Sequence, residues 1–412
     1  MKAAQLRERA AAISFRQLRM FESVGRLSSV RQGAEECNLS QPAVTQALAK
    51  LEMQLSVTLL ERHTSGSYLT DAGRIFHVRV RRMVEQMESA LGGLGVSGGS
   101  ASAAISNRIS RSQVRCLTAI IEIGSFAKAA DALGLTQASL QRAARDLEGN
   151  LRKTIFHRTA AGVMVTPDGI EFGRKLKLAA QEVEWGVREI ETARGGKLSQ
   201  IVIGTLPFGG SLLLATVLDE FVRMHPDADI KIVTEGASEM LKRLRGGEVD
   251  LVLGVVQETT AHDLRNEGLA KTPYQVVGRR GHPLLLNDGA TLDDLAGFDW
   301  VVGSEGSSRR ICFDNLFFGK KPPKASIATS ALPIILHLLT NSDRLTLMTS
   351  YELVYEGNTL VEIPFGSMDP SPSIGITMRS EWLPTALHQD FIKLLREKVG
   401  ASMVPLPLPL FA

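Results

Sequence analysis

The sequence predicts a multidomain protein: two copies of a small helix-dominated domain, each followed by a long helix, and then a two-lobed α/β domain. The chain has 412 residues, too many for one compact core. The front half repeats itself, and from Lys197 short apolar strands alternate with helices. Charge divides in the same way. Residues 1–200 hold 28 Lys and Arg against 19 Asp and Glu (+9), and the remainder holds 19 against 25 (−6). A basic front half indicates that nucleic acid, if bound, is bound there.

The front half matches itself without a gap at an offset of 96 positions, so that Gln17 aligns with Gln113 and Glu52 with Glu148. A repeat at a fixed offset indicates one structural unit used twice. Between the copies, residues 92–100 are rich in Gly and Ser, which favours a flexible linker. In chain order, the predicted parts are copy one (14–72), its linker helix (73–91), a flexible linker (92–109), copy two (110–168), its linker helix (169–195) and the α/β domain (198–400).

The elements of each copy follow from local spacing. In copy one, Leu18 and Phe21 space as the buried face of a first helix. A second helix and a tight turn follow, and Ser40 is then a favourable N-cap for a third helix. Short strands near residues 59–60 and 67–70 form a hairpin. Two helices, a tight turn, a third helix and a hairpin make up a winged helix-turn-helix domain.

In such a domain the third helix enters the major groove of DNA, led by its N-terminal residues. Gln pairs with adenine, small methyl groups suit thymine, and Arg favours guanine, whereas Arg near the hairpin suits phosphate. The predicted DNA contacts are Ser29, Gln41, Pro42, Ala43, Thr45, Gln46 and Arg62 in copy one and Gln137, Ser139, Gln141, Arg142 and Arg158 in copy two. Pattern alone leaves two alternatives open, a plain helix-packing motif and a protein-interaction module.

Longer runs of residues resemble one family. Residues 40–45 (Ser-Gln-Pro-Ala-Val-Thr), 59–62 (Leu-Leu-Glu-Arg) and 69–73 closely resemble the LysR-type transcriptional regulators, and copy two resembles them at 124–137 and 156–169. The back half resembles the effector domain of that family, most clearly at 241–254. The resemblance implies a sequence-specific DNA-binding regulator whose activity a small-molecule effector modulates.

The duplication departs from the family pattern, which has one winged domain, one linker helix and one effector domain. In copy two, Ala138-Ser139-Leu140-Gln141 replaces the usual Pro-Ala-Val-Ser or Pro-Ala-Val-Thr run. Either both copies contact DNA bases, or copy two is a scaffold that pairs with copy one through the linker helices. A further alternative is a DNA-binding protein whose second winged domain and C-terminal domain serve oligomerisation and protein interaction rather than ligand sensing.

The back half predicts parallel sheets, because strands such as 201–204, 229–234 and 249–255 alternate with helices. Its fold resembles a periplasmic binding protein, with lobe one at 200–275 and 365–400, lobe two at 276–364 and a ligand cleft between them. Hydroxyls at helix N-termini suit a carboxylate or a sugar, and Arg309 or Arg310 could add charge. The predicted effector contacts are Thr205, Pro207, Phe208, Ser211, Ser304, Ser307, Thr329, Ser330 and Met348.

Nothing in the sequence predicts an enzyme, a metal site or a cofactor other than the effector. The Gly-rich run 204–211 lacks the Lys of a P-loop, no nucleophile elbow occurs, and the three cysteines and eight histidines are scattered. No signal peptide or membrane span is apparent, so we expect a cytoplasmic protein with no membrane partner. The expected partners are double-stranded DNA, the effector, and further copies of the chain in a dimer or tetramer formed through linker helices and effector domains. RNA polymerase is left open as another partner.

Overall fold

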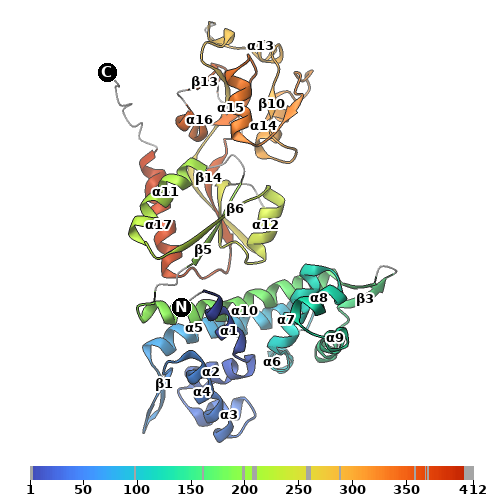
Figure 1. Cartoon of the computed structure of the whole chain (residues 1–412), viewed down its shortest axis with the longest axis vertical. Coiled ribbons are helices and arrows are strands. Elements are labelled where there is room, and N and C mark those ends of the chain that lie inside the picture. The colour runs from blue at the N-terminus through green and yellow to red at the C-terminus, as the bar shows by residue number, and fades with distance from the viewer. Residues whose placement is uncertain are drawn as a thin grey trace. The chain divides into compact units, whose positions relative to one another are not determined.

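The structure is a computed structural model that describes residues 3–96, 99–159, 162–196, 200–206, 211–256, 261–286, 289–356, 359–366, 368 and 371–402. The chain divides into two compact units, Met1–Ser199 and Gln200–Ala412. The first unit is built mainly of helices, and the second contains mixed sheets covered by helices (Figure 1). Within the described residues, no helix is both long enough and apolar enough to cross a membrane.

The first unit contains the same run of elements twice. Copy one has α2 (Phe15–Leu27), α3 (Val30–Glu36), α4 (Gln41–Leu55), β1 (Leu60–His63), β2 (Gly66–Leu69) and α5 (Asp71–Gly93). Copy two has α7 (Arg111–Ile123), α8 (Phe126–Leu133), α9 (Gln137–Leu151), β3 (Phe156–Thr159), β4 (Gly162–Val165) and α10 (Pro167–Ala193). Both hairpins are antiparallel. The predicted helices, hairpins and linker helices are therefore present in both copies.

Hydrogen bonds recur between the copies at the offset of 96 residues. Ser14 opens α2 with a reciprocal capping box, and Ser110 opens α7 with the same arrangement. The carboxylate of Glu52 accepts bonds from two consecutive backbone N–H groups at the start of the first hairpin, at 2.7 and 3.1 Å. Glu148 accepts the equivalent pair in copy two, at 2.8 and 3.0 Å. The sequence repeat is thus also a repeat of the contacts that join the third helix to the hairpin.

Residues 92–109 differ from the flexible linker that their composition predicts, because they contain α6 (Gly99–Ser106). Ser102, Ser106 and Ile109 are buried, and Arg19 donates a hydrogen bond to Ser106 Oγ at 3.2 Å. The small side chains that suggested a linker allow this helix to pack closely on α5. Its counterpart at the 96-residue offset is α1 (Ala3–Ala12), a helix that the sequence did not lead us to expect, which packs on α10.

The first and last segments of the second unit together form a lobe built on a five-stranded sheet of order β6-β5-β7-β14-β8. This first lobe holds β5 (Gln200–Thr205), α11 (Ser211–Met224), β6 (Asp229–Thr234), α12 (Ala237–Arg245), β7 (Leu251–Val255), β8 (Leu264–Lys271), β14 (Ser373–Arg379) and α17 (Ala386–Ser402). The second lobe holds β9 (Tyr274–Arg279), η1 (Pro283–Leu286), α13 (Leu292–Ala296), β10 (Val301–Val302), α14 (Ser308–Leu316), β11 (Ile327–Ala328), α15 (Leu332–Thr340), β12 (Thr346–Thr349), α16 (Ser350–Glu356) and β13 (Leu360–Glu362). Separate hydrophobic clusters underlie the two lobes.

The sheets are mixed rather than parallel throughout. β5 runs parallel to β6 and β7, and β10 runs parallel to β11, as alternating strands and helices predict. However, β14 is antiparallel to β7 and β8, and β9 is antiparallel to β12 and β13. The chain crosses between the lobes twice, and β14 returns to lobe one in the direction opposite to β7 and β8. The first crossing lies at 272–273, which places Tyr274 in lobe two instead of lobe one.

Candidate nucleic-acid interface and ligand cavity

The N-terminal half of α4 presents most of the predicted contact residues on one outer face. Val44 and Leu48 are buried and hold the helix against its domain. On the outer side, Gln41, Pro42, Ala43 and Gln46 are exposed, and Thr45 is half-buried. The N-cap is Ser40, as predicted, but its side chain makes no capping hydrogen bond.

The corresponding helix of copy two forms without the early proline. Thr136 is the N-cap of α9, and its hydroxyl oxygen accepts a hydrogen bond from the backbone N–H of Ser139 at 3.1 Å. Gln137, Ser139, Gln141 and Arg142 are exposed, whereas the intervening Leu140 is buried. The Ser139 hydroxyl also lies 2.8 Å from that of Thr136, so it is engaged locally.

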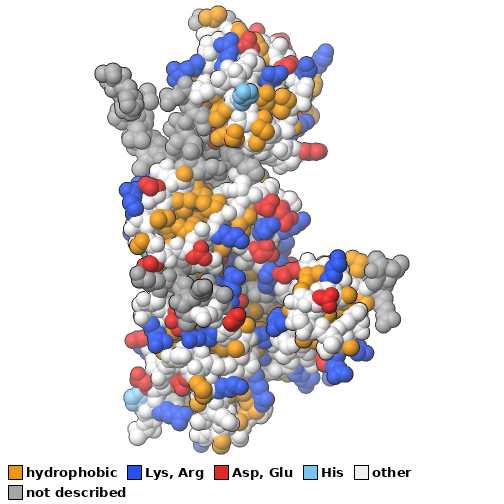
Figure 2. All heavy atoms as spheres, viewed as in Figure 1, with side chains coloured by type: hydrophobic (Ala, Val, Ile, Leu, Met, Phe, Trp, Pro, Cys, Tyr) orange, Lys and Arg blue, Asp and Glu red, His pale blue; other side chains and the backbone are white. Residues whose placement is uncertain are grey.

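The exposed face of α9 carries one basic residue that motif matching missed. Arg145 is exposed and lies one helical turn beyond Gln141 and Arg142. Side chains three and four positions apart share a helix face, which is the signal that could have identified it. On the face shown in Figure 2, Lys and Arg side chains lie over both copies and are interspersed with acidic ones.

The hairpin of copy one is fixed to the turn between α2 and α3. Ser67 N–H donates to the carbonyl of Ser28 at 2.9 Å, and a Cβ on Gly66 would lie 2.6 Å from that oxygen. Only glycine fits this approach, so the position of the hairpin is well defined. Arg62 is exposed on β1, where it could contact phosphate, while Ser29 caps α3 by accepting from Gln32 N–H at 3.3 Å. Arg158 lies in β3, and its side chain is outside the described residues.

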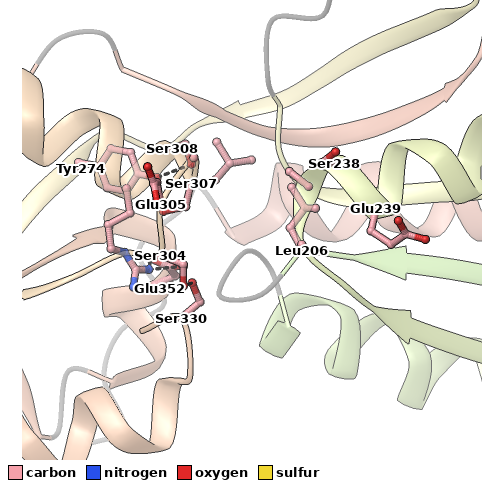
Figure 3. Close-up of a pocket in the computed structure, with 15 residues that line it drawn as sticks. Leu206, Ser238, Glu239, Tyr274, Ser304, Glu305, Ser307, Ser308, Ser330 and Glu352 are labelled. Atoms are coloured by element: carbon pink, nitrogen blue, oxygen red, sulfur yellow. Dashed lines mark hydrogen bonds and ion pairs between the residues drawn. The ribbon is translucent and has the colours of Figure 1, made fainter. Parts of the chain in front are cut away.

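The second unit contains a cavity of about 570 Å³ between its two lobes. Lobe one contributes the start of α12 and the ends of β5 and β7, and lobe two contributes the start of α14 and neighbouring loops (Figure 3). The lining residues are Leu206, Gly236, Ala237, Ser238, Glu239 and Val255 from lobe one and Tyr274, Ser304, Glu305, Gly306, Ser307, Ser308, Arg309, Ser330 and Glu352 from lobe two.

Hydroxyl groups form two hydrogen-bonded pairs in the lobe-two wall. The Tyr274 hydroxyl lies 2.8 Å from Ser308 Oγ, and Ser304 Oγ lies 3.1 Å from Ser330 Oγ. Burial raises the pKa of Tyr274 to about 12, so the phenol stays neutral and can donate a hydrogen bond. Ser307 caps α14 by accepting from the backbone N–H of Arg310 at 3.2 Å. The wall therefore offers hydroxyls and a helix N-terminus to a ligand.

A buried ion pair stands behind this wall. Arg309 Nη2 lies 3.3 Å from Glu352 Oε2, and both side chains are almost fully buried. Burial raises the pKa of Glu352 to about 7, although the charge of Arg309 opposes the shift. Burial also lowers the pKa of Arg309 against the attraction of Glu352. The cavity thus borders a carboxyl group whose protonation changes near neutral pH.

Three of the predicted effector contacts, Ser304, Ser307 and Ser330, line the cavity. Thr205 instead is buried and its hydroxyl lies 2.9 Å from that of Thr234, and Thr329 accepts a hydrogen bond from Ala331 N–H at 3.1 Å. Met348 is fully buried in a hydrophobic cluster, because it belongs to β12, a strand whose four residues are all buried. Pro207 and Phe208 lie outside the described residues, and Ser211 begins α11 with its side chain outside them.

Sequence reasoning missed Tyr274 and Glu352, two residues that approach Ser308 and Arg309 only after folding. Tyr274 opens β9, and Glu352 lies in the helix that follows β12, the strand paired with β9. No local motif marks either residue. Among the described residues, no cluster of three potential metal ligands occurs.

Comparison with known proteins gives matches to family models, to individual regulators and to solved structures. The model of the bacterial regulatory helix-turn-helix proteins of the lysR family matches residues 15–74 and 112–170, and the LysR substrate binding domain matches residues 194–400. The HTH-type transcriptional regulator GalR of Pseudomonas putida is 29% identical over 390 residues, covering 93% of this chain and 96% of that protein. GbpR of Rhizobium radiobacter is 24% identical over 242 residues, covering 56% of this chain and 78% of that protein.

Among solved structures, a full-length OxyR variant from Pseudomonas aeruginosa has a TM-score of 0.49 at 20% identity, covering 70% of this chain and 93% of that one. The family assignment rests on the sequence matches, since the substrate-binding model alone spans half of the chain. With helix-turn-helix matches in front of that domain, the chain belongs to the LysR family of DNA-binding transcriptional regulators, which carry a C-terminal effector domain.

Proposed function

We propose that this regulator contacts operator DNA through two winged helix-turn-helix domains and that a small carboxylate or sugar in the inter-lobe cavity alters this binding. The observation that carries the proposal is the cavity of about 570 Å³, which is lined by hydroxyls and by helix starts from both lobes. Ligand sites in proteins are commonly clefts of this size with a few convergent polar groups. A ligand that contacts both lobes would favour their closed arrangement, as in periplasmic binding proteins.

Two observations support a duplicated winged domain. The hydrogen bonds of Glu52 and Glu148 recur at the same offset as the sequence repeat. In addition, the alignment with the Pseudomonas putida regulator extends over 93% of this chain, so it includes most of both copies. The exposed faces of α4 and α9 then supply the base contacts, with Gln41, Thr45 and Gln46 in copy one and Gln137, Gln141 and Arg142 in copy two.

The chemistry of the cavity favours an effector with oxygen acceptors. The starts of α12 and α14 both lie at its wall, and helix N-termini attract negative charge. Tyr274 and the serines can donate to carboxylate or hydroxyl oxygens. Three carboxyl groups, Glu239, Glu305 and Glu352, also line the cavity, so the ligand is a small acid or a polyhydroxyl compound rather than a multiply charged anion.

The effector proposal is tested by a thermal-shift screen of the full chain with single carboxylic acids and sugars, followed by DNA binding with each hit. Replacing Ser308 with Ala removes a hydroxyl from the wall, and we expect an effector to bind roughly 10-fold more weakly to this variant. The matched control is Ser380→Ala, whose exposed hydroxyl bonds the carbonyl of His262 outside the cavity. If hits raise the melting temperature equally in both variants, or leave DNA binding unchanged, the cavity is not the effector site that gates DNA binding.

A regulator of this kind would act in the cytoplasm, where bacterial DNA lies. Contacts between effector domains of separate chains, and contact with RNA polymerase, complete the proposal. Light scattering of the full chain with and without DNA measures the first, and pull-down of purified polymerase measures the second.

A further inference from the structure

The linker helices α5 and α10 pair with each other inside one chain. They pack side by side along much of their length (Figure 1) and run antiparallel. The register follows from two contacts: Arg79 bonds Glu182, and a Cβ on Gly186 would lie 2.7 Å from a ring carbon of Phe76. These two contacts require α5 and α10 to run in opposite directions.

The pairing has an internal two-fold pseudo-symmetry. Because the helices run in opposite directions, we count forward from Arg79 and backward from Glu182. Met83 lies four residues after Arg79 on α5, and Ala179 lies three residues before Glu182 on α10. Met83 and Ala179 are both fully buried, and they are counterparts at the 96-residue offset. In a symmetric homodimer a residue on the axis faces its own copy. By the register of these contacts Met83 lies opposite Ala179, and each of them occupies the equivalent position in its copy.

The leading helices exchange in the same way. α1, at the start of copy one, packs on α10 of copy two, and α6, at the start of copy two, packs on α5 of copy one. Arg9 on α1 donates to Glu191 on α10 at 2.7 Å. The guanidinium of Arg111 stacks over the ring of Phe15, its own counterpart at the offset of 96, at 5.0 Å from the ring centre. Each copy thus completes the packing of the other.

The charges between the linker helices favour the pairing of α5 with α10 over the pairing of two α5 helices from separate chains. Arg79 is buried between Glu182 at 2.9 Å and Glu189 at 2.6 Å. Burial acts to lower the pKa of Arg79, but the hydrogen bond and charge of Glu189, together with Glu182, outweigh it and raise the pKa. In a pair of two α5 helices, the places of these glutamates would be taken by their counterparts Gln86 and Gly93. A buried arginine would then lack both carboxylates, which disfavours that pairing.

We propose that a single chain of this regulator is a complete DNA-binding pseudo-dimer, whose target is one duplex with two unlike half-sites. The inference rests on the proposed DNA contacts of both copies. The framework is symmetric, but the outer faces differ: Ala43, Thr45 and Gln46 on α4 correspond to Ser139, Gln141 and Arg142 on α9. Different side chains at equivalent positions favour different bases, with guanine favoured by the arginine of copy two. An ordinary two-fold dimer would instead favour a palindrome.

Met83 and Ala179, the two residues on the pseudo-symmetry axis, provide a direct test of the pairing in the full chain. Met83→Cys combined with Ala179→Cys should form a disulfide under mild oxidation, so that the product keeps the mass of one chain on a non-reducing gel and has two fewer free thiols than its reduced form. Each single variant, with the native chain as background control, should give no covalent dimer. A dimer from Met83→Cys alone would show α5 helices paired between chains, and one from Ala179→Cys alone would show the same for α10. A dimer from the double variant only would show exchange between chains. Any of these results, or no disulfide at all, overturns the proposal.

A footprint separates this inference from the proposed function. The probe is the duplex that the full chain selects from a pool with a random central region. Gln41→Ala with Thr45→Ala should weaken protection of one half-site roughly 10-fold or more, and Gln137→Ala with Arg142→Ala should weaken the other. If the first pair weakens both halves equally and the second weakens neither, two chains each supply copy one and the inference is wrong. If no duplex is selected, the proposed DNA contacts themselves fail.

Discussion

Removing the charge of Arg79 should loosen the pair of linker helices while leaving the chain folded. The side chain is 1% exposed and bonds Glu182, which is 7% exposed, and Glu189, which is 24% exposed. Arg79→Met keeps an unbranched apolar stem in place of the arginine stem and removes the charged guanidinium. The variant therefore isolates the contribution of the ion pairs from that of apolar packing.

The magnitude follows from what remains beside each carboxylate. Breaking a buried ion pair by removing one partner costs about 3–5 kcal/mol. Arg82 still lies 3.2 Å from Glu182, and Glu189 can turn toward water, so the cost should fall to about 2–3 kcal/mol. Because 1.4 kcal/mol is a factor of ten, opening of the pair should become roughly 30–150-fold more frequent.

Hydrogen exchange of the full chain, followed by mass spectrometry of peptides from α5 and α10, measures this opening directly. The matched control is Arg81→Met on the same helix. Arg81 is 56% exposed and its partner Glu85 is 61% exposed at 3.4 Å, so exchange in this variant should change less than about 3-fold. Adding Glu182→Met to Arg79→Met removes the remaining buried charge and should restore most of the protection.

Two results would refute the reasoning. Equal exchange in the Arg79→Met and Arg81→Met variants would mean that Arg79 does not hold the helix pair together. Faster exchange in the double variant than in the single one would mean that packing, rather than an unpaired carboxylate, controls the opening.

Four other variants test separate parts of the structure. Burial raises the pKa of Glu352 from 4.5 to about 7, so its contribution to stability is complete below pH 4.5 and is lost as the pH rises through 7. The melting temperature of the wild type should therefore fall over this range more than that of Glu352→Gln, and parallel curves would contradict the assignment. A Cβ at Gly149 would have open space around it, so Gly149→Ala should stabilise α9 by about 1 kcal/mol in denaturant titrations. Gly186→Ala should instead destabilise by about 1–2 kcal/mol, because overpacking against Phe76 outweighs the same helix gain; equal effects would refute the close approach. Arg142→Ala should reduce preference for the selected duplex without changing the salt dependence, whereas a loss of about one unit of salt slope would indicate a phosphate contact.

The sequence predicted the parts of the fold that local spacing encodes. The third helix of copy one begins at Gln41, directly after the predicted N-cap Ser40, and the third helix of copy two begins at Gln137, after Thr136. Composition failed at 99–106, which the Gly- and Ser-rich linker predicted over 92–109 included although these residues form α6. A run of small residues is compatible with both a flexible chain and a closely packed helix, and only the α5 surface beside it decides between them.

The cavity was predictable only in part, for a related reason. Ser304 and Ser307 lie beside a helix start, which is a local signal. Glu352 and Tyr274 reach the cavity through the antiparallel pairing of β12 with β9. The direction in which these two strands pair depends on packing within lobe two, and alternation of strands and helices does not reveal it. Met348 follows the same logic, since every residue of β12 is buried by strands and helices that come from elsewhere in the chain.

Comparison of the two copies separates the constraints of the fold from those of the interface. Glu52 and Glu148 are identical and make the same backbone bonds, because a different side chain would leave two N–H groups at the hairpin without their acceptor. The outer positions of α4 and α9 carry no such obligation and differ, as Gln46 and Arg142 do. Covalent linkage of the copies permits this divergence, since a symmetric dimer must change both of its DNA-contacting faces together. The buried ion pair of Arg79 with Glu182 favours pairing of the two copies within one chain, and the proposal therefore predicts a fixed order of unlike half-sites on DNA.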